Sequence, residues 1–115
     1  MWSSVSLLGR FTERPELKIT PKAGTSVTNF CLAVDDGWGE KKHASFVDCV
    51  AFGKTAENVC KYMDKGRLIL VAGRLRTRSY EGNDGAKRKV TEVIVTESVF
   101  MPGARKDDDR QEPPE

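Results

Sequence analysis

The sequence contains no apolar run long enough to cross a membrane. No run is longer than five residues, the length of residues 68–72, whereas about 20 are needed for a helix that spans a bilayer. The first four residues have neither the basic part nor the hydrophobic part of a secretory signal. We therefore expect a cytoplasmic protein without a membrane partner.

Histidine and cysteine are scarce. His43 is the single histidine, and Cys31, Cys49 and Cys60 form no C-x-x-C pair. A structural zinc site needs four such ligands at close spacing, and a disulfide framework needs an even number of cysteines at high density. We expect no metal and no cofactor, and three reduced thiols that pack as small apolar side chains.

The sequence also lacks a catalytic constellation. The segment 37–41, GWGEK, has neither the spacing of a phosphate-binding loop nor the Ser or Thr that follows its lysine. Asp35 and Asp36 are adjacent acids, but the single histidine does not complete a metal site for phosphodiester cleavage. We expect a binding protein without catalytic residues. A small nuclease is the alternative from another class, and an assay of cleavage with and without divalent metal separates the two.

What the chain does contain is enough apolar and charged sequence for one folded domain. It has 115 residues, of which 38% are apolar and 31% are charged, and its net charge is +2. Residues 105–115 carry three basic and five acidic side chains, so the rest of the chain carries a net charge of +4. We predict a domain over residues 1–103 and a short acidic, disordered tail over 104–115. The basic body favours a polyanionic partner.

The hydrophobic pattern predicts an all-β fold with one helix. Apolar and polar residues alternate in a way typical of strands over residues 5–9, 25–34, 44–52, 67–80 and 90–100, with a short extended piece at 17–20. Residues 55–65 have the helical i, i+3, i+4, i+7 pattern, with Thr55 as the N-cap and Gly66 as the stop. Five strands with a helix between the third and fourth is the order of the OB-fold, a Greek-key barrel that binds oligonucleotides or oligosaccharides.

The fourth predicted strand carries a row of cations. Side chains in a strand point to alternate faces, so one face receives Arg74, Arg76, Arg78 and Tyr80, and the core face receives Ile69, Val71, Gly73 and Leu75. Two interpretations fit this row. It is either a solvated strand face with acidic partners, for which the nearby candidates are Glu81, Asp84, Glu92 and Glu97, or a groove that follows a nucleic-acid backbone. We favour the groove.

Aromatic residues are interleaved with further cations. Trp38 lies close to Lys41, and Phe46 and Phe52 share one face of the third strand, with Lys54 close behind. Unpaired bases stack on rings, and the phosphates between them need cations. Taken singly, Phe46 and Phe52 fit the core as well as a stacking surface, whereas we assign Phe30 and Phe100 to the core.

In these residues the chain resembles the bacterial-type single-stranded DNA-binding proteins. The resemblance extends over residues 1–101. It is carried by VSLLGR at 5–10, PELK at 15–18, VTNFCLAV at 27–34, FGKTAEN at 52–58, YMDKG at 62–66, GRLRTRSY at 73–80 and TEV at 91–93.

The resemblance implies an OB-fold homotetramer that wraps single-stranded DNA without strong sequence preference. Such a protein acts in replication, recombination and repair, in the cytoplasm at the nucleoid. The family's base-stacking positions fall on Trp38, Phe46, Phe52 and Tyr80, and its cationic positions fall on Lys41, Lys54, Lys65, Arg76 and Arg78. Arg74 is added from strand alternation alone. The family also pairs first strands across a subunit contact, which here involves residues 2–8.

The tail departs from the family pattern. Asp107, Asp108 and Asp109 form an acidic cluster, but the apolar tip with which many members recruit replication and repair proteins is missing. Recruitment of such partners through the tail therefore has little support. The second candidate function is an OB-fold accessory factor of the primosomal type, which acts mainly through protein contacts, and RNA is an alternative ligand. A dimer that binds a protein tightly and DNA weakly would favour the accessory factor.

Overall fold

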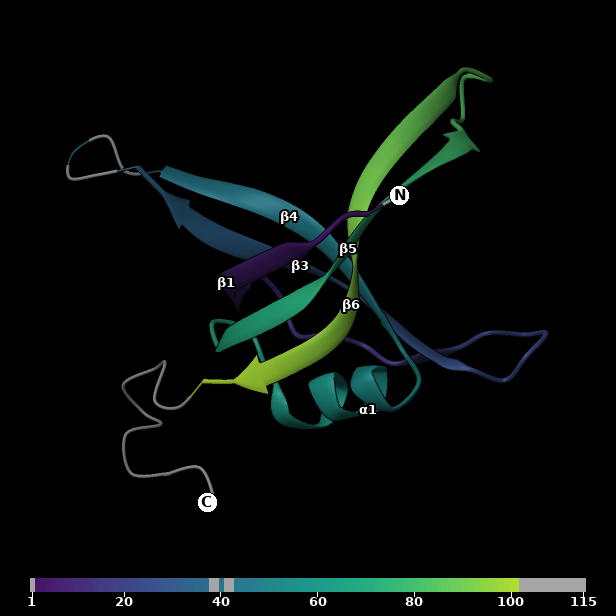
Figure 1. The fold of residues 1–115 in the computed structure, drawn as a ribbon. Helices are drawn as coiled ribbons and strands as arrows, with labels where there is room; N and C mark the ends of the chain where they lie inside the picture. The colour runs from purple at the N-terminus through teal and green to yellow at the C-terminus, as the bar shows by residue number, and fades with distance from the viewer. Residues whose placement is uncertain (1, 38–39, 41–42, 102–115) are drawn as a thin grey trace.

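The computed structural model describes residues 2–37, 40 and 43–101. Its elements are β1 (Val5–Phe11), β2 (Lys18–Ile19), β3 (Ser26–Asp36), β4 (His43–Phe52), α1 (Gly53–Tyr62), β5 (Leu68–Glu81) and β6 (Lys87–Phe100). Figure 1 shows a small barrel with α1 beneath it and two long hairpins, β3–β4 and β5–β6, that extend beyond it as arms. No helix in the described part of the chain has the length and apolar character of a membrane-spanning segment.

The strands form one sheet that closes on itself. The strand order is β1-β5-β6-β4-β3-β2, and β1 also pairs with β3 at Arg10/Ala33 and Phe11/Leu32. All neighbours are antiparallel except β4 and β6, which pair in parallel at Cys49/Val93 and Val50/Ile94. The two-residue β2 only lengthens the sheet at the edge of β3. The five remaining strands form the predicted OB-fold barrel, with the helix between its third and fourth strands, so the predicted fold class is confirmed.

The core fills the barrel and continues under the helix. Helix α1 contributes Ala56 and Val59, and Met63 follows directly after it, which is the predicted helical spacing. Phe30 is buried as predicted, with its ring 5.0 Å from that of Phe11. Phe100 is half-buried against the core, which agrees in part with its predicted place.

The predicted start of the helix is wrong by two residues. Thr55 is not the N-cap, because the helix begins at Gly53, directly after the last residue of β4, and no side chain caps it. Gly53 has φ +64°, a value that glycine adopts at little cost, so the chain turns from strand to helix without a loop. The helix ends at Tyr62. Gly66 lies in the following turn, where its N–H donates to the carbonyl of Phe11 at 2.8 Å.

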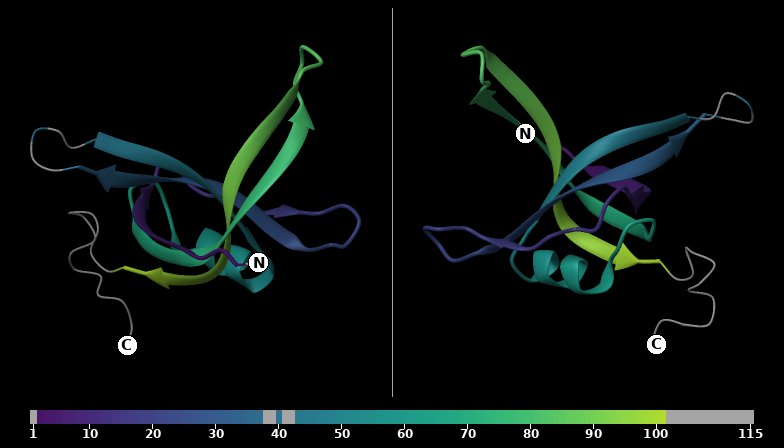
Figure 2. Two further views of the ribbon diagram at one scale, coloured as in Figure 1. Left: turned by 45° about the horizontal axis from the view of Figure 1, so that its top comes forward. Right: turned by 180° about the vertical axis from the view of Figure 1, so that it is seen from behind.

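A β-bulge marks where the β5–β6 arm leaves the barrel. The register passes from Ala72/Glu97 to Gly73/Val95, which leaves Thr96 as an extra residue. A Cβ atom at Gly73 would overlap the carbonyl of Ile94, so only glycine fits there. The two views of Figure 2 show the arm rising from the barrel beyond this point.

The bulge also explains one wrong prediction. Leu75 was expected in the core, but its side chain is about half exposed. It lies beyond the bulge, where the arm no longer covers the barrel, and its N–H donates to Ser3 Oγ at 3.3 Å. Trp2 and Arg74 border the same shallow surface.

Candidate nucleic-acid interface

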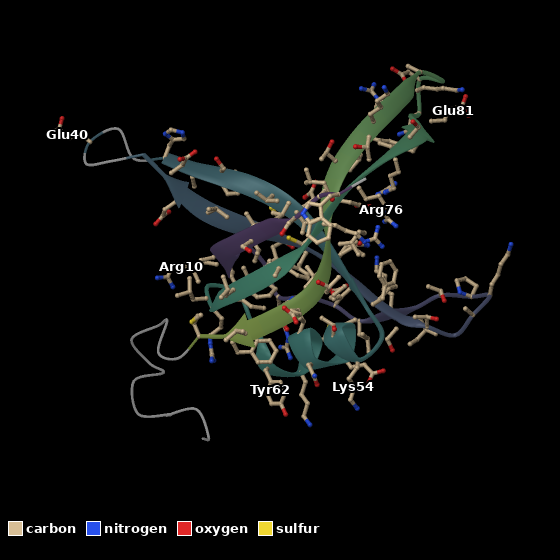
Figure 3. The ribbon with its side chains drawn as sticks, viewed as in Figure 1. Arg10, Glu40, Lys54, Tyr62, Arg76 and Glu81 are labelled. Carbon is tan, nitrogen blue, oxygen red and sulfur yellow. The ribbon has the colours of Figure 1, made fainter. Side chains whose placement is uncertain are left out.

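A groove with a volume of about 690 Å³ runs between the barrel and the β5–β6 arm. Its floor is formed by side chains of β3 and β4, one wall by the loop of residues 12–18, and the other wall by the arm. The polar and aromatic residues that line it are Thr12, Glu13, Arg14, Glu16, Lys18, Asn29, Phe30, Cys31, Asp48, Cys49, Arg78, Tyr80 and Glu92. Figure 3 shows Arg76 at the base of the arm and Glu81 at its tip.

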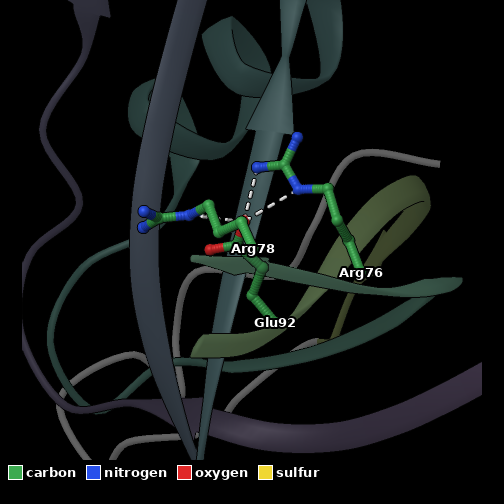
Figure 4. Close-up of polar contacts among 3 residues, drawn as sticks. All are labelled: Arg76, Arg78 and Glu92. Atoms are coloured by element: carbon green, nitrogen blue, oxygen red, sulfur yellow. Dashed lines mark hydrogen bonds and ion pairs between the residues drawn. The ribbon is translucent and has the colours of Figure 1, made fainter. Parts of the chain in front are cut away.

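Two arginines of β5 share one buried carboxylate of β6. Arg76 Nε donates to Glu92 Oε2 at 2.9 Å, and its Nη2 bonds the same oxygen. Arg78 Nε donates to that oxygen at 3.2 Å. Figure 4 shows the two guanidinium groups on either side of the carboxylate. Burial by itself raises the pKa of Glu92, but the hydrogen bonds and charges of Arg76 and Arg78 outweigh it, so its pKa lies below its usual value.

The cluster of Arg76, Arg78 and Glu92 decides in part whether the arginine row is a solvated strand face with acidic partners or a groove that follows a nucleic-acid backbone. Glu92 is one of the four acids named as candidate partners, and Asp84 pairs instead with Arg88 at 2.9 Å. The pairing does not neutralise the row, because two guanidinium groups face one carboxylate and both stay partly exposed. The Nη atoms of Arg78 point away from Glu92 (Figure 4) and donate to no other residue that the structure describes.

The predicted stacking rings within the described residues lie on the surface. Phe46 is 69% exposed, Phe52 39% and Tyr80 43%, so none of them fills the core. Tyr80 lines the groove. Phe46 and Phe52 lie on β4 in the same alternation as Asp48 of the groove floor, one on each side of it along the strand. Trp38 and Lys41, the other predicted contacts of the β3–β4 connection, lie outside the described residues.

The remaining predicted cations within the described residues do not line the groove. Lys54 is exposed in the first turn of α1 (Figure 3), and Lys65 is exposed in the turn after that helix. Arg74 is exposed beside Trp2, at the base of the arm. The structure therefore brings Arg78 and Tyr80 together in the groove, with Arg76 beside them on Glu92, and leaves these three cations outside it.

Several groove residues have no prediction from the sequence. Arg14 belongs to the loop between β1 and β2, which carries no strand or helix pattern, and Lys18 is the first residue of β2, inside the short extended piece predicted at 17–20. Asn29 and Asp48 face the groove from adjacent strands. A signal for Asp48 was present, because it lies on the predicted face of Phe46 and Phe52.

The described residues show no metal cluster and no disulfide. No three His, Cys, Asp or Glu side chains gather as a metal site within the part of the chain that the structure describes. The three thiols are free, and Cys49 is buried, which raises its pKa to about 12. The groove lining combines the ring of Tyr80 and three cationic side chains, which are means of binding a flexible polyanion with aromatic bases, with four carboxylates, of which Glu92 is paired with arginines.

Comparisons with known proteins agree with this geometry. Residues 2–101 match the model of the single-strand binding protein family. A single-stranded DNA-binding protein of Clostridium tetani is 50% identical over 99 residues, which cover 84% of this chain and 68% of that protein. Single-stranded DNA-binding protein 3 of Listeria innocua is 50% identical over 105 residues, which cover 88% of this chain and 64% of that protein. In a solved structure of the Plasmodium falciparum SSB complex with ssDNA, the matching chain has a TM-score of 0.80 at 25% identity, over 88% of this chain and 96% of that one.

Proposed function

The chain belongs to the single-strand binding protein family, and on that premise we propose that it binds single-stranded DNA in the groove described above. It holds the strand without cleaving it, and it serves replication, recombination and repair in the cytoplasm at the nucleoid. The observation that carries the proposal is that Phe46, Phe52 and Tyr80 are exposed around a groove into which Arg78 projects. Core packing does not account for these rings.

The mechanism follows from what an unpaired strand exposes. Its bases stack on Phe46, Phe52 and Tyr80, and we assign a fourth base to Trp38. Each stacked base contributes about 1–3 kcal/mol, whichever base it is. Phosphates lie against Arg78 and Arg76, with Lys41, Lys54, Lys65 and Arg74 as outer contacts. A base held against a ring is not available for pairing, so the bound strand stays single.

A homotetramer is the assembly that we propose for the working protein. The outer face of β1, β5 and β6 exposes Leu8 and Val99, and both lie opposite Leu70 in the sheet. We name Leu8, Leu70 and Val99 the outer apolar ladder. Contact between the outer apolar ladder and other copies of the chain would remove apolar surface from water. It would also cover β1, the first strand of the chain.

The experiment that tests DNA binding uses tryptophan fluorescence with a matched pair of tyrosines. In a Trp2→Phe background Trp38 is the only tryptophan, and oligo(dT) should quench it. Tyr80→Ala should weaken the apparent Kd by about 5- to 150-fold, which corresponds to the loss of one stacking contact. Tyr62→Ala removes a similarly exposed ring, 51% against 43%, from the far end of α1 (Figure 3) and should leave the Kd unchanged.

The result that contradicts the proposal is equally clear. If low-salt titration with oligo(dT) leaves the fluorescence and a direct binding readout, such as the anisotropy of a labelled oligonucleotide, unchanged, the groove is not a DNA site. If Tyr80→Ala and Tyr62→Ala behave alike, binding takes place elsewhere on the surface.

A further inference from the structure

The cluster of Arg76, Arg78 and Glu92 holds more positive charge than its carboxylate needs. The side chain of Glu92 is 5% exposed, whereas those of Arg76 and Arg78 are 39% and 51% exposed. Arginine is always charged in proteins, so one guanidinium group neutralises the carboxylate and the other leaves the cluster positive. Satisfying the buried acid therefore accounts for one of the two arginines and leaves the other to be explained.

The two arginines differ in the atoms with which they hold Glu92. Arg76 is bound to Glu92 Oε2 through two nitrogen atoms, Nε and Nη2. Arg78 is bound to the same oxygen through Nε alone, at 3.2 Å. A guanidinium group has five N–H donors, one on Nε and four on the two Nη atoms. Arg78 therefore keeps all four of its Nη donors away from Glu92, and it is the arginine of the pair that lines the groove.

The outer end of Arg78 has the shape that a phosphate group requires. Its two Nη atoms lie on the side of the guanidinium group away from Glu92 (Figure 4), and such a pair can donate to two oxygens of one phosphate at once. The inner end is fixed to a carboxylate that is buried in the sheet. A side chain that is already held in place loses less conformational freedom when it binds a ligand. Lysine carries its charge on one nitrogen atom, and a single atom cannot take both positions.

We propose that Arg78 is a two-ended contact for DNA, anchored to Glu92 through Nε and bonded to one phosphate through both Nη atoms, with Glu92 as its positioning residue. The proposal rests on the proposed function and deepens it, because it names the atoms that hold the backbone of the strand in the groove. Arg76 neutralises Glu92 and so leaves the charge of Arg78 to the phosphate. It follows that position 78 requires an arginine and not merely a positive charge.

The test replaces arginine by lysine, which keeps the charge and removes the second end. Arg78→Lys should weaken the Kd for labelled oligo(dT) by about 10-fold, the factor that corresponds to one hydrogen bond to a charged group. The slope of log Kd against log salt concentration should fall by about 0.7, the value for one phosphate of a single strand. Arg88→Lys is the matched control, because Arg88 is bound to the carboxylate of Asp84 on the same arm but does not line the groove. It should change neither the Kd nor the slope.

A double-mutant comparison isolates the positioning role of Glu92. The ratio of the Kd values with and without Arg78→Lys is measured once with Glu92 present and once in Glu92→Gln, under conditions in which circular dichroism shows every variant folded. Any general effect of removing the negative charge cancels in this ratio. The ratio should fall from about 10-fold to about twofold in Glu92→Gln, because a neutral amide anchors Nε more weakly than a carboxylate does.

Each outcome supports or overturns a stated part of the proposal. If Arg78→Lys binds oligo(dT) as tightly as the native protein, or if Arg88→Lys weakens binding as much, the two-ended contact is wrong. These two variants decide that point even if Glu92→Gln does not fold. If Glu92→Gln lowers the unfolding free energy but leaves the ratio unchanged, Glu92 is a structural acid and does not position Arg78. If the native protein does not bind oligo(dT) at low salt, the proposed DNA binding itself has failed.

Discussion

At the scale of single residues, the best-defined interaction is the carboxylate of Glu92 between Arg76 and Arg78. A buried acid is costly unless it is paired and hydrogen-bonded, and here the two guanidinium groups satisfy it. The same contacts hold Arg78 in the groove lining and Arg76 beside it at the base of the arm. Glu92 therefore has two roles, since it stabilises the fold and positions cations that the proposed function uses.

We predict that Glu92 makes the stability of the protein depend on pH below neutrality. Its pKa in the folded protein lies below the usual value of 4.5, so the folded state gains stability from it above pH 4.5. This gain is lost as the pH falls through the lower folded pKa. Glu92→Gln should cost about 1.5–3 kcal/mol at pH 7, the range for hydrogen bonds to charged groups. Urea unfolding between pH 3 and pH 7 measures both effects.

The Asp84–Arg88 pair is the control for this prediction. Both of its side chains are exposed, and exposed pairs contribute about 0–1 kcal/mol. Asp84→Asn should leave the unfolding free energy and its acid dependence nearly as they are. If the unfolding free energy of Glu92→Gln depends on pH in the same way as that of the native protein, the role given to Glu92 is wrong.

The sequence predicts the faces of these residues but not their partners. Strand alternation is enough to place Arg76, Arg78 and Tyr80 on one face, but it leaves Phe46 equally suited to the core and to the surface, and only the structure shows it exposed. It does not select Glu92 among four acids, because the partner depends on the cross-strand register. The register at Arg76/Glu92 is set by the length of the hairpin turn, since the pairing is continuous from Glu81/Lys87 to this pair, and strand alternation carries no signal for that length.

At the scale of the elements, the β5–β6 hairpin depends on one glycine. Gly73 lies at the register shift, where the backbone of Ile94 occupies the space of a Cβ atom. We predict that Gly73→Ala lowers the unfolding free energy by about 1–3 kcal/mol or more, the usual cost of overpacking. Gly82→Ala at the tip of the same arm meets mainly the flexible side chain of Arg88 and should cost much less. Thermal unfolding of the two variants compares them, and equal losses would contradict the role of the bulge.

The sequence predicts the boundaries of the elements correctly where the pattern of side chains sets them. The prediction fails where the backbone conformation sets them. The strands around Phe30 and Phe52 lie where the alternation places them. The helix starts two residues before Thr55 because Gly53, with φ +64°, lets the chain turn directly from β4 into the helix. Thr55 is a better capping residue by type, but it lies inside the helix and does not cap it. Leu75 is exposed for a related reason. The alternation that predicts it in the core continues past the bulge, but the barrel ends there.

At the scale of the whole molecule, the outer apolar ladder predicts self-association. Native mass spectrometry should show four copies of the chain, and Leu8→Glu should shift the mass toward dimer or monomer, because it places a charge on the apolar contact. Ile19→Glu is the matched control, since Ile19 is also an exposed aliphatic residue but lies on β2, which pairs with β3 and not with β1. A native monomer, or a tetramer unaffected by Leu8→Glu, would contradict the proposed assembly.

The direct passage from β4 into α1 has a consequence for how tightly a base can be gripped. Phe52 is at once the last residue of a groove strand and the residue before the helix whose Ala56 and Val59 seal the core. With no loop between them, the backbone that carries this ring is immobilised by the barrel before any ligand arrives. A partner that lies on Phe52 has little further ordering to impose, so more of the contact energy is retained as affinity.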